Sequence, residues 1–255
     1  MRNLIGVIAA AAAAFVLSGC HADTKQPTAA SVAPAPATPV QAPAPASANP
    51  AEDLKQAFAA AFGSAAPAVR IVTRDGQETT LRYRPARLIP IGGHDALISE
   101  ARSEGCHGCY GELALHYLAR QGTGFKVIGA WPEISDGGSF GEPPSWTVRD
   151  DLFDGPALVV TAGGTWQGCT VAYADLIELT PDKPVVRANR VLTTYDDGGE
   201  ADGSDDQSVD GAIRAGQKGR AFSVDYTGAH PRKIEYRLLG ETYEADHGAP
   251  GLPSC

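Results

Sequence analysis

The stretch Glu112-Leu113-Ala114-Leu115-His116-Tyr117-Leu118 decides the fold, because it can form either a helix or a strand. Its residue types favour a helix. Its pattern favours a strand, since Leu113, Leu115 and Tyr117 alternate onto one face of a strand but spread widely around a helix. A glycine-containing turn and a second apolar run, residues 121–131, follow at hairpin spacing. We therefore predict two antiparallel strands here.

Short apolar segments separated by Gly, Pro and Asp turns continue on both sides of this hairpin. Residues 69–73 and 79–83 flank Asp75-Gly76, a turn signature of β-hairpins. Further strands are expected at residues 112–120, 125–131, 157–161, 170–179, 185–194, 208–214, 221–227, 233–238 and 241–245, the last two joined by a tight turn at Leu239-Gly240. The pattern predicts a mostly β fold, and an antiparallel sandwich, a barrel and a propeller-like meander all remain open.

One helix is expected before the strands, at residues 52–62. Leu54, Phe58 and Phe62 recur four residues apart, which places them on one face of a helix. Asn49-Pro50 provides a start signal, and Gly63 a stop signal. The sequence therefore predicts a mostly β domain with one N-terminal helix.

Composition divides the chain before that helix. Residues 21–50 are dominated by Ala, Pro, Ser, Thr and Gln and hold almost no large apolar side chain, so they cannot offset the entropy of ordering. We interpret residues 20–50 as a tether and residues 51–255 as a single globular domain. The chain has a net charge of −9, which argues against nucleic acid as a partner, because nucleic-acid binding depends on Lys and Arg neutralising phosphates.

The first 20 residues have the pattern of an export signal. Arg2 is followed by an apolar run, residues 4–16, which is too short to span the bilayer core of about 30 Å as a helix. Leu17-Ser18-Gly19-Cys20 then resembles the lipobox of bacterial lipoproteins. The resemblance implies removal of residues 1–19 as a signal peptide, acylation of Cys20 and a membrane anchor. Because His21 rather than Asp follows Cys20, it also implies the outer membrane, with the domain facing the periplasm.

Four cysteines remain after Cys20, at Cys106, Cys109, Cys169 and Cys255. An even number in an oxidising compartment favours disulfides, and we predict the pairs Cys106–Cys109 and Cys169–Cys255. A thioredoxin-like redox pair at Cys106 and Cys109 is an alternative that requires a helix after them. A zinc site is another, using both cysteines with His116 and either His94 or His107.

The best candidate for a binding loop is the turn-rich stretch of residues 131–146. It carries Trp131, Phe140 and Trp146, which can stack on a glycan or a peptide, or alternatively close the core beneath a loop. Gly137-Gly138-Ser139-Phe140-Gly141 matches the nucleophile-elbow pattern of hydrolases, but Pro143 and Pro144 prevent the helix that an elbow needs. The glycine-rich residues 163–168 are expected to form a hairpin turn.

A dense acidic segment covers residues 196–206. Alternating oxygen ligands at Glu200, Asp202, Ser204 and Asp206 are compatible with a calcium ion, although the EF-hand pattern fails because Asp205 stands where its glycine belongs. A solvated acidic turn is the alternative.

None of these motifs has the sequence context that a hydrolase or a nucleotide-binding site requires. The sequence therefore favours a membrane-anchored envelope protein with a non-catalytic binding or structural role, whose partner is an envelope protein or a glycan. Two alternatives remain, namely a periplasmic thiol-disulfide oxidoreductase using Cys106 and Cys109, and an inhibitor of an envelope-directed enzyme that uses the aromatic loop as a plug.

Overall fold

The computed structural model describes residues 49–74, 76–104, 109–198 and 207–246, all within the unit of the chain that spans Ala42–Cys255. These residues form one helix and thirteen strands, so the predicted mostly β fold with one N-terminal helix is confirmed. Within the described ranges, no helix has both the length and the apolar character needed to cross a membrane.

The helix α1 spans Pro50–Phe62, close to the predicted range. Its first turn is capped by Asn49, whose side-chain oxygen accepts a hydrogen bond from the N–H of Glu52 at 3.2 Å. Gly63 ends it with a φ of 71°, and its N–H donates to the carbonyl of Ala59 at 2.9 Å. Start and stop therefore follow from the residues that predicted them.

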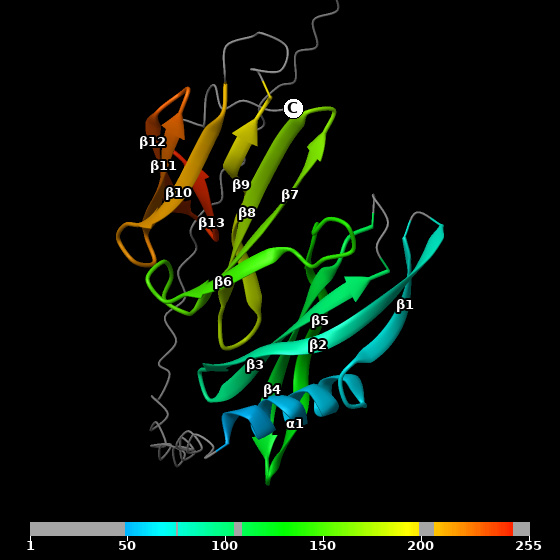
Figure 1. The fold of residues 1–255 in the computed structure, drawn as a ribbon. Coiled ribbons are helices and arrows are strands. Elements are labelled where there is room, and N and C mark those ends of the chain that lie inside the picture. The colour runs from blue at the N-terminus through cyan, green and yellow to red at the C-terminus, as the bar shows by residue number, and fades with distance from the viewer. Residues whose placement is uncertain (1–48, 75, 105–108, 199–206, 247–255) are drawn as a thin grey trace, which may run out of the picture. The chain divides into compact units, whose positions relative to one another are not determined.

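The first sheet has five antiparallel strands in sequential order. The strands are β1 (Ala68–Arg74), β2 (Gln77–Ile91), β3 (His94–Ser103), β4 (Glu112–Gln121) and β5 (Gly124–Asp136). The deciding stretch is thus a strand, β4, and its side chains are buried on both faces. Figure 1 shows α1 beside this sheet.

The second sheet has eight strands, again in sequential order, so each sheet is an antiparallel meander. Its strands are β6 (Ser145–Arg149), β7 (Ala157–Trp166), β8 (Cys169–Leu179), β9 (Pro184–Asp196), β10 (Val209–Ala215), β11 (Ala221–Gly228), β12 (Arg232–Leu239) and β13 (Thr242–Ala245). In Figure 1, β7 and β8 extend beyond β6, which pairs with only part of β7.

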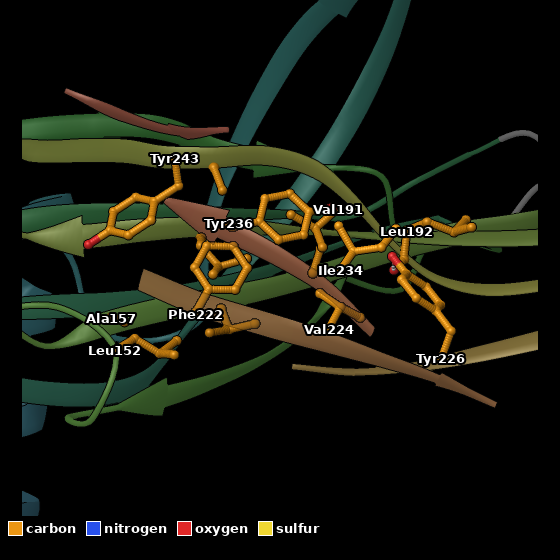
Figure 2. Close-up of a cluster of buried hydrophobic side chains, with 14 of the residues drawn as sticks. Leu152, Ala157, Val191, Leu192, Phe222, Val224, Tyr226, Ile234, Tyr236 and Tyr243 are labelled. Carbon is orange, nitrogen blue, oxygen red and sulfur yellow. Dashed lines mark hydrogen bonds between the residues drawn. The ribbon is translucent and has the colours of Figure 1, made fainter. Parts of the chain in front are cut away.

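Three apolar clusters hold these elements together. One joins α1 to one face of the first sheet, and one lies between the two sheets. The third contains residues from β7 through β13, and because strands far apart in the sheet order share it, the second sheet curls around this cluster. Figure 2 shows part of it, including Phe222 stacked on Tyr236 with ring centroids 4.6 Å apart.

Three sequence predictions need correction. Strands β3 and β6 were not predicted. Residues 163–166, expected to be part of a turn, belong to strand β7, and the turn is confined to Gln167-Gly168. The expected long loop at residues 131–146 is shorter, because Trp131 lies in β5 and Trp146 in β6, which leaves residues 137–144 as the connection.

Candidate functional site

The connection between β5 and β6, residues 137–144, is fastened to the junction between β3 and β4. The N–H of Ser103 donates to the carbonyl of Gly141 at 3.0 Å, and the N–H of Gly111 donates to that of Glu142 at 2.9 Å. The N–H of Gly141 in turn donates to the carbonyl of Cys109 at 2.9 Å. The structure therefore brings residues 137–144 and Cys109, the end of the Cys-x-x-Cys segment, together. The sequence did not predict this contact.

This contact depends on a glycine. A Cβ atom at Gly111 would lie 2.3 Å from the carbonyl oxygen of Ala101 and 2.5 Å from the nitrogen of Pro143. Both contacts are with backbone, which cannot swing aside, so only glycine permits the loop to pack here.

The two tryptophans of the predicted binding loop pack inward. The Trp131 ring lies 4.8 Å from that of Tyr117, and both tryptophans are partly buried against the cluster between the sheets. The indole N–H of Trp146 donates to Glu100 at 2.7 Å. These contacts support the core-closing alternative, because a ring held in this way is not available to stack on a ligand together with Phe140.

Phe140 differs from both tryptophans, since it is 60% exposed. It has a φ of 54° and Gly141 a φ of 80°, while the N–H of Glu142 donates to the carbonyl of Ser139 at 3.0 Å. These are the features of a type I′ turn, whose first central position favours Asn, Asp or Gly. A bulky residue with a positive φ is strained, and strain of this kind is concentrated at functional sites.

A second exposed aromatic side chain, Trp166, was not predicted as a binding residue. It is 72% exposed and directly precedes the turn Gln167-Gly168, where φ is 49° and 88°. A tryptophan beside a two-residue turn that ends in glycine, between two β runs, is the signal that could have identified it.

Trp166 ends a stretch of β7 that has one strand neighbour instead of two. β6 pairs with residues 157–161 of β7, whereas β8 pairs with residues 157–166. Within the described parts of the chain, residues 162–166 therefore pair on one side only, and we call them the open edge of β7. Gly137 lies against one end of this edge, since a Cβ placed on it would be 3.0 Å from the Cβ of Ala162.

Two of the four cysteines after Cys20 lie among the described residues, so the disulfide prediction can be examined only in part. Cys109 and Cys169 are both disulfide-bonded, whereas Cys106 and Cys255 lie outside the described residues, so the pairing stays a prediction. The element after Cys109 is the strand β4, which removes the helix N-terminus that the redox alternative requires.

The zinc prediction can be examined in part, because His94 and His116 lie among the described residues. The His94 ring packs 4.8 Å from the Tyr117 ring, and the His116 ring packs 5.0 Å from the Phe62 ring. Residues 116 and 117 point to opposite faces of β4, so His94 and His116 lie on opposite faces of the sheet. The two histidines therefore cannot bind one zinc ion. The described ranges contain no group of three His, Cys, Asp or Glu side chains suited to a metal. The calcium candidates Glu200, Asp202, Ser204 and Asp206, the alternative zinc ligand His107 and the lipidation residue Cys20 lie outside the described residues.

Groups with shifted pKa values occur in both sheets, and the one among them on the helix-covered face whose pKa falls furthest is His116. Burial and the neighbouring Arg70 guanidinium lower the pKa of His116 to about 4. On the same face, the Tyr83 hydroxyl donates to the buried Glu112, and Arg120 bridges Asp53 of α1 and Asp95 of β3 at 2.7 and 3.1 Å. These groups are held by partners and by aromatic packing, which indicates a structural role.

An apolar groove of about 450 Å³ lies between α1, the residues that follow it and Pro85 of β2. Its lining is Glu52, Lys55, Gln56, Phe58, Ala59, Ala65, Ala66 and Pro85. The two charged side chains in this lining are exposed, so the groove brings together no buried titratable group.

Comparison of the chain with protein-family models, with curated proteins and with solved structures finds no match.

Proposed function

We propose that this chain is a lipid-anchored envelope protein whose β domain holds an envelope partner without catalysing a reaction. Leu17-Ser18-Gly19-Cys20 supports the anchor, and the Ala/Pro-rich residues that follow support a tether between anchor and domain. Two or three acyl chains on Cys20 give stable attachment where one would not.

The observation that carries the binding role is the exposure of Trp166. A tryptophan that is 72% exposed leaves a large apolar area in water, and tryptophan is among the residues that dominate binding energy at interfaces. Phe140, 60% exposed on its strained turn, adds a second such area, and Gly137 of the same connection lies against Ala162 at one end of the open edge. Exposed aromatic rings on or beside turns are typical of recognition surfaces.

The placement of the titratable groups supports a role without catalysis. Catalytic groups have pKa values shifted within an accessible site. Here His116, whose pKa is strongly lowered, is 2% exposed and packs against Phe62, whereas the exposed Phe140 lies on a turn and the exposed Trp166 lies at the end of a strand. An inhibitor of an envelope-directed enzyme is a special case of this proposal, in which the partner is an enzyme and the Phe140 turn enters its cleft.

The binding role can be tested with Trp166→Ala in the mature protein held in detergent micelles. The control is Leu239→Ala, because Leu239 is also exposed (58%) and also precedes a two-residue turn, at the far side of the second sheet. The bound fraction is measured against purified cell-wall sacculi and against an extract of envelope proteins. We expect Trp166→Ala to weaken binding at least tenfold and Leu239→Ala to leave it unchanged. Equal binding by both variants would contradict the proposal.

The anchor has its own test. Cys20→Ser should leave an unprocessed precursor or move the protein out of the membrane fraction, as measured by mass spectrometry and fractionation. Unchanged mass and unchanged membrane association would refute lipidation at Cys20.

A further inference from the structure

We propose that the open edge of β7, residues 162–166, accepts an extended polypeptide segment of the partner as an added β-strand. This inference rests on the proposed binding role and narrows the partner from an envelope component of any kind to a protein with an extended segment that carries Lys or Arg.

The backbone of the open edge can pair with an added strand. β8 pairs with residues 157–166 of β7, but β6 pairs with residues 157–161 only. In a β-strand, alternate residues point their N–H and C=O groups to opposite sides, so part of the backbone of residues 162–166 faces away from β8. No described strand meets that side, and a row of such groups is the template on which an extended peptide adds.

The open edge of β7 has no charged residue and no proline, unlike the outer strands β5 and β13. The outer strand β5 carries Lys126 and Pro132, and the outer strand β13 has only four residues, including Glu244. Charge and proline are among the usual protections of an edge. The open edge of β7 reads Ala-Gly-Gly-Thr-Trp and contains neither charge nor proline.

The open edge also has space for a side chain of the partner, at Gly164 beside Trp166. Gly164 and Trp166 are two residues apart and therefore point to the same face of β7. A Cβ atom at Gly164 would meet nothing within 4 Å, and Trp166 beside it is 72% exposed. An apolar side chain of an added strand, placed opposite Gly164, would find open space there and the indole ring as its neighbour.

The charge near the tip favours a basic rather than an acidic segment. Asp196 of β9 pairs with Thr170 of β8, which in turn pairs with Thr165 of β7. Asp197 follows, and Gly198 lies beside the carbonyl of Gly168 in the turn that follows Trp166. Two carboxylates two strands from the edge, in a chain of net charge −9, attract a segment that carries Lys or Arg beyond Trp166.

Site-specific photo-cross-linking of the full-length protein in its own envelope tests the register that strand addition requires. A photo-reactive phenylalanine analogue replaces Gly164, Trp166 or, as the control, Leu239, one position at a time. Cross-linked peptides are then mapped by mass spectrometry. We expect positions 164 and 166 to cross-link to one segment of one partner protein, at partner residues two apart, and Leu239 to give no such product.

A synthetic peptide of the mapped segment gives the second measurement. An added strand binds through its backbone, so methylating the peptide nitrogens that face β7 should weaken its binding to the mature protein at least tenfold. Methylating the alternate nitrogens should leave binding within twofold. Equal effects of the two methylation patterns would overturn strand addition.

The outcomes separate this inference from the binding role itself. Cross-links to a glycan, to residues 162–166 of a second copy, or to partner residues out of register would overturn the added strand while Trp166 remained a binding residue. Absence of any polypeptide product at positions 164 and 166 would also overturn it. Failure of the binding role is recognised separately, by unaltered binding of Trp166→Ala.

Discussion

The face of the first sheet beneath α1 and the tip of the β7–β8 hairpin contain opposite kinds of residue. Beneath α1, His116, Glu112 and Tyr83 are each at most 2% exposed, and the charged Arg120 is held between two carboxylates. At the tip, Trp166 is 72% exposed on an edge without charge. Beneath α1, buried polar groups stabilise the packing of the helix on the sheet. At the hairpin tip, an apolar side chain is exposed to solvent and does not contribute to the core.

This difference shows where function should be sought in such a chain. On the helix-covered face, the shifted pKa values of His116 and Asp95 are caused by burial, by neighbouring charges and by a hydrogen bond from Arg120 within a packed layer. Exposure and backbone strain point to the Phe140 turn and to Trp166. The two regions should therefore respond oppositely to mutation, the first in stability and the second in binding.

The largest effect on stability is expected for Phe58→Ala. Phe58 is 1% exposed and stacks on Phe62 with ring centroids 4.5 Å apart. Removing a buried phenylalanine ring costs about 3–5 kcal/mol. Denaturant unfolding should show that loss, while binding by the molecules that remain folded stays unchanged. A loss below about 1 kcal/mol would mean that α1 contributes little to the fold.

The next effect is a dependence on pH through His116. Its pKa falls from 6.5 to about 4 on folding, so the unfolded chain binds the proton more strongly between these values. Stability due to this group is fully present above pH 6.5 and declines as pH falls towards 4. The total loss is at most about 3 kcal/mol. Urea unfolding at several pH values measures it.

His116→Gln is the matched control, because it keeps a polar side chain and removes the titration. Its stability should change less steeply than that of the wild type between pH 6.5 and 4. Parallel pH profiles of the two proteins would show that His116 is not the group responsible.

A smaller effect is expected for Phe140→Asn. Asparagine adopts a positive φ more readily than phenylalanine, so the change relieves roughly 1 kcal/mol of backbone strain at the first central position of the turn. The melting temperature should hold or rise by about 2–4 °C, while partner binding weakens. A fall of several degrees would show that the Phe140 ring stabilises the fold.

The smallest effect on stability is expected for Trp166→Ala. Exposed substitutions usually change stability by less than about 0.5 kcal/mol, so its unfolding curve should overlay that of the wild type. A loss above about 1 kcal/mol would place Trp166 among the packing residues and remove the contrast between the two regions.

The sequence predicted the elements whose patterns are local. The helix follows from its cap, its stripe and its terminal glycine, and β4 from the alternation of Leu113, Leu115 and Tyr117. β3 was missed because its buried residues include the polar Asp95 and Ser99, so its sequence shows neither alternation nor a continuous apolar run. β2 was predicted too short because Pro85 interrupts its pattern, and a register shift in its pairing with β3 lies at that point.

The candidate site was only partly predictable. The turn at Ser139-Phe140-Gly141-Glu142 was visible only in part, because Gly141 favours a positive φ whereas Phe140 does not. The inward packing of Trp131 and Trp146 depends on β3 and on the approach of the two sheets, which are separated in sequence. The importance of Trp166 depends on where β6 stops pairing with β7, and that is a tertiary fact.

Amide hydrogen exchange tests the role of the open edge most directly. The exchange of residues 162–166 is compared between the purified protein and the same protein in its envelope, with residues 242–245 of the opposite edge strand β13 as the internal reference. We predict that exchange at residues 162–166 slows at least tenfold in the envelope and that residues 242–245 are unchanged. Equal exchange of residues 162–166 in both preparations, or equal slowing at both edges, would contradict a binding role for this edge.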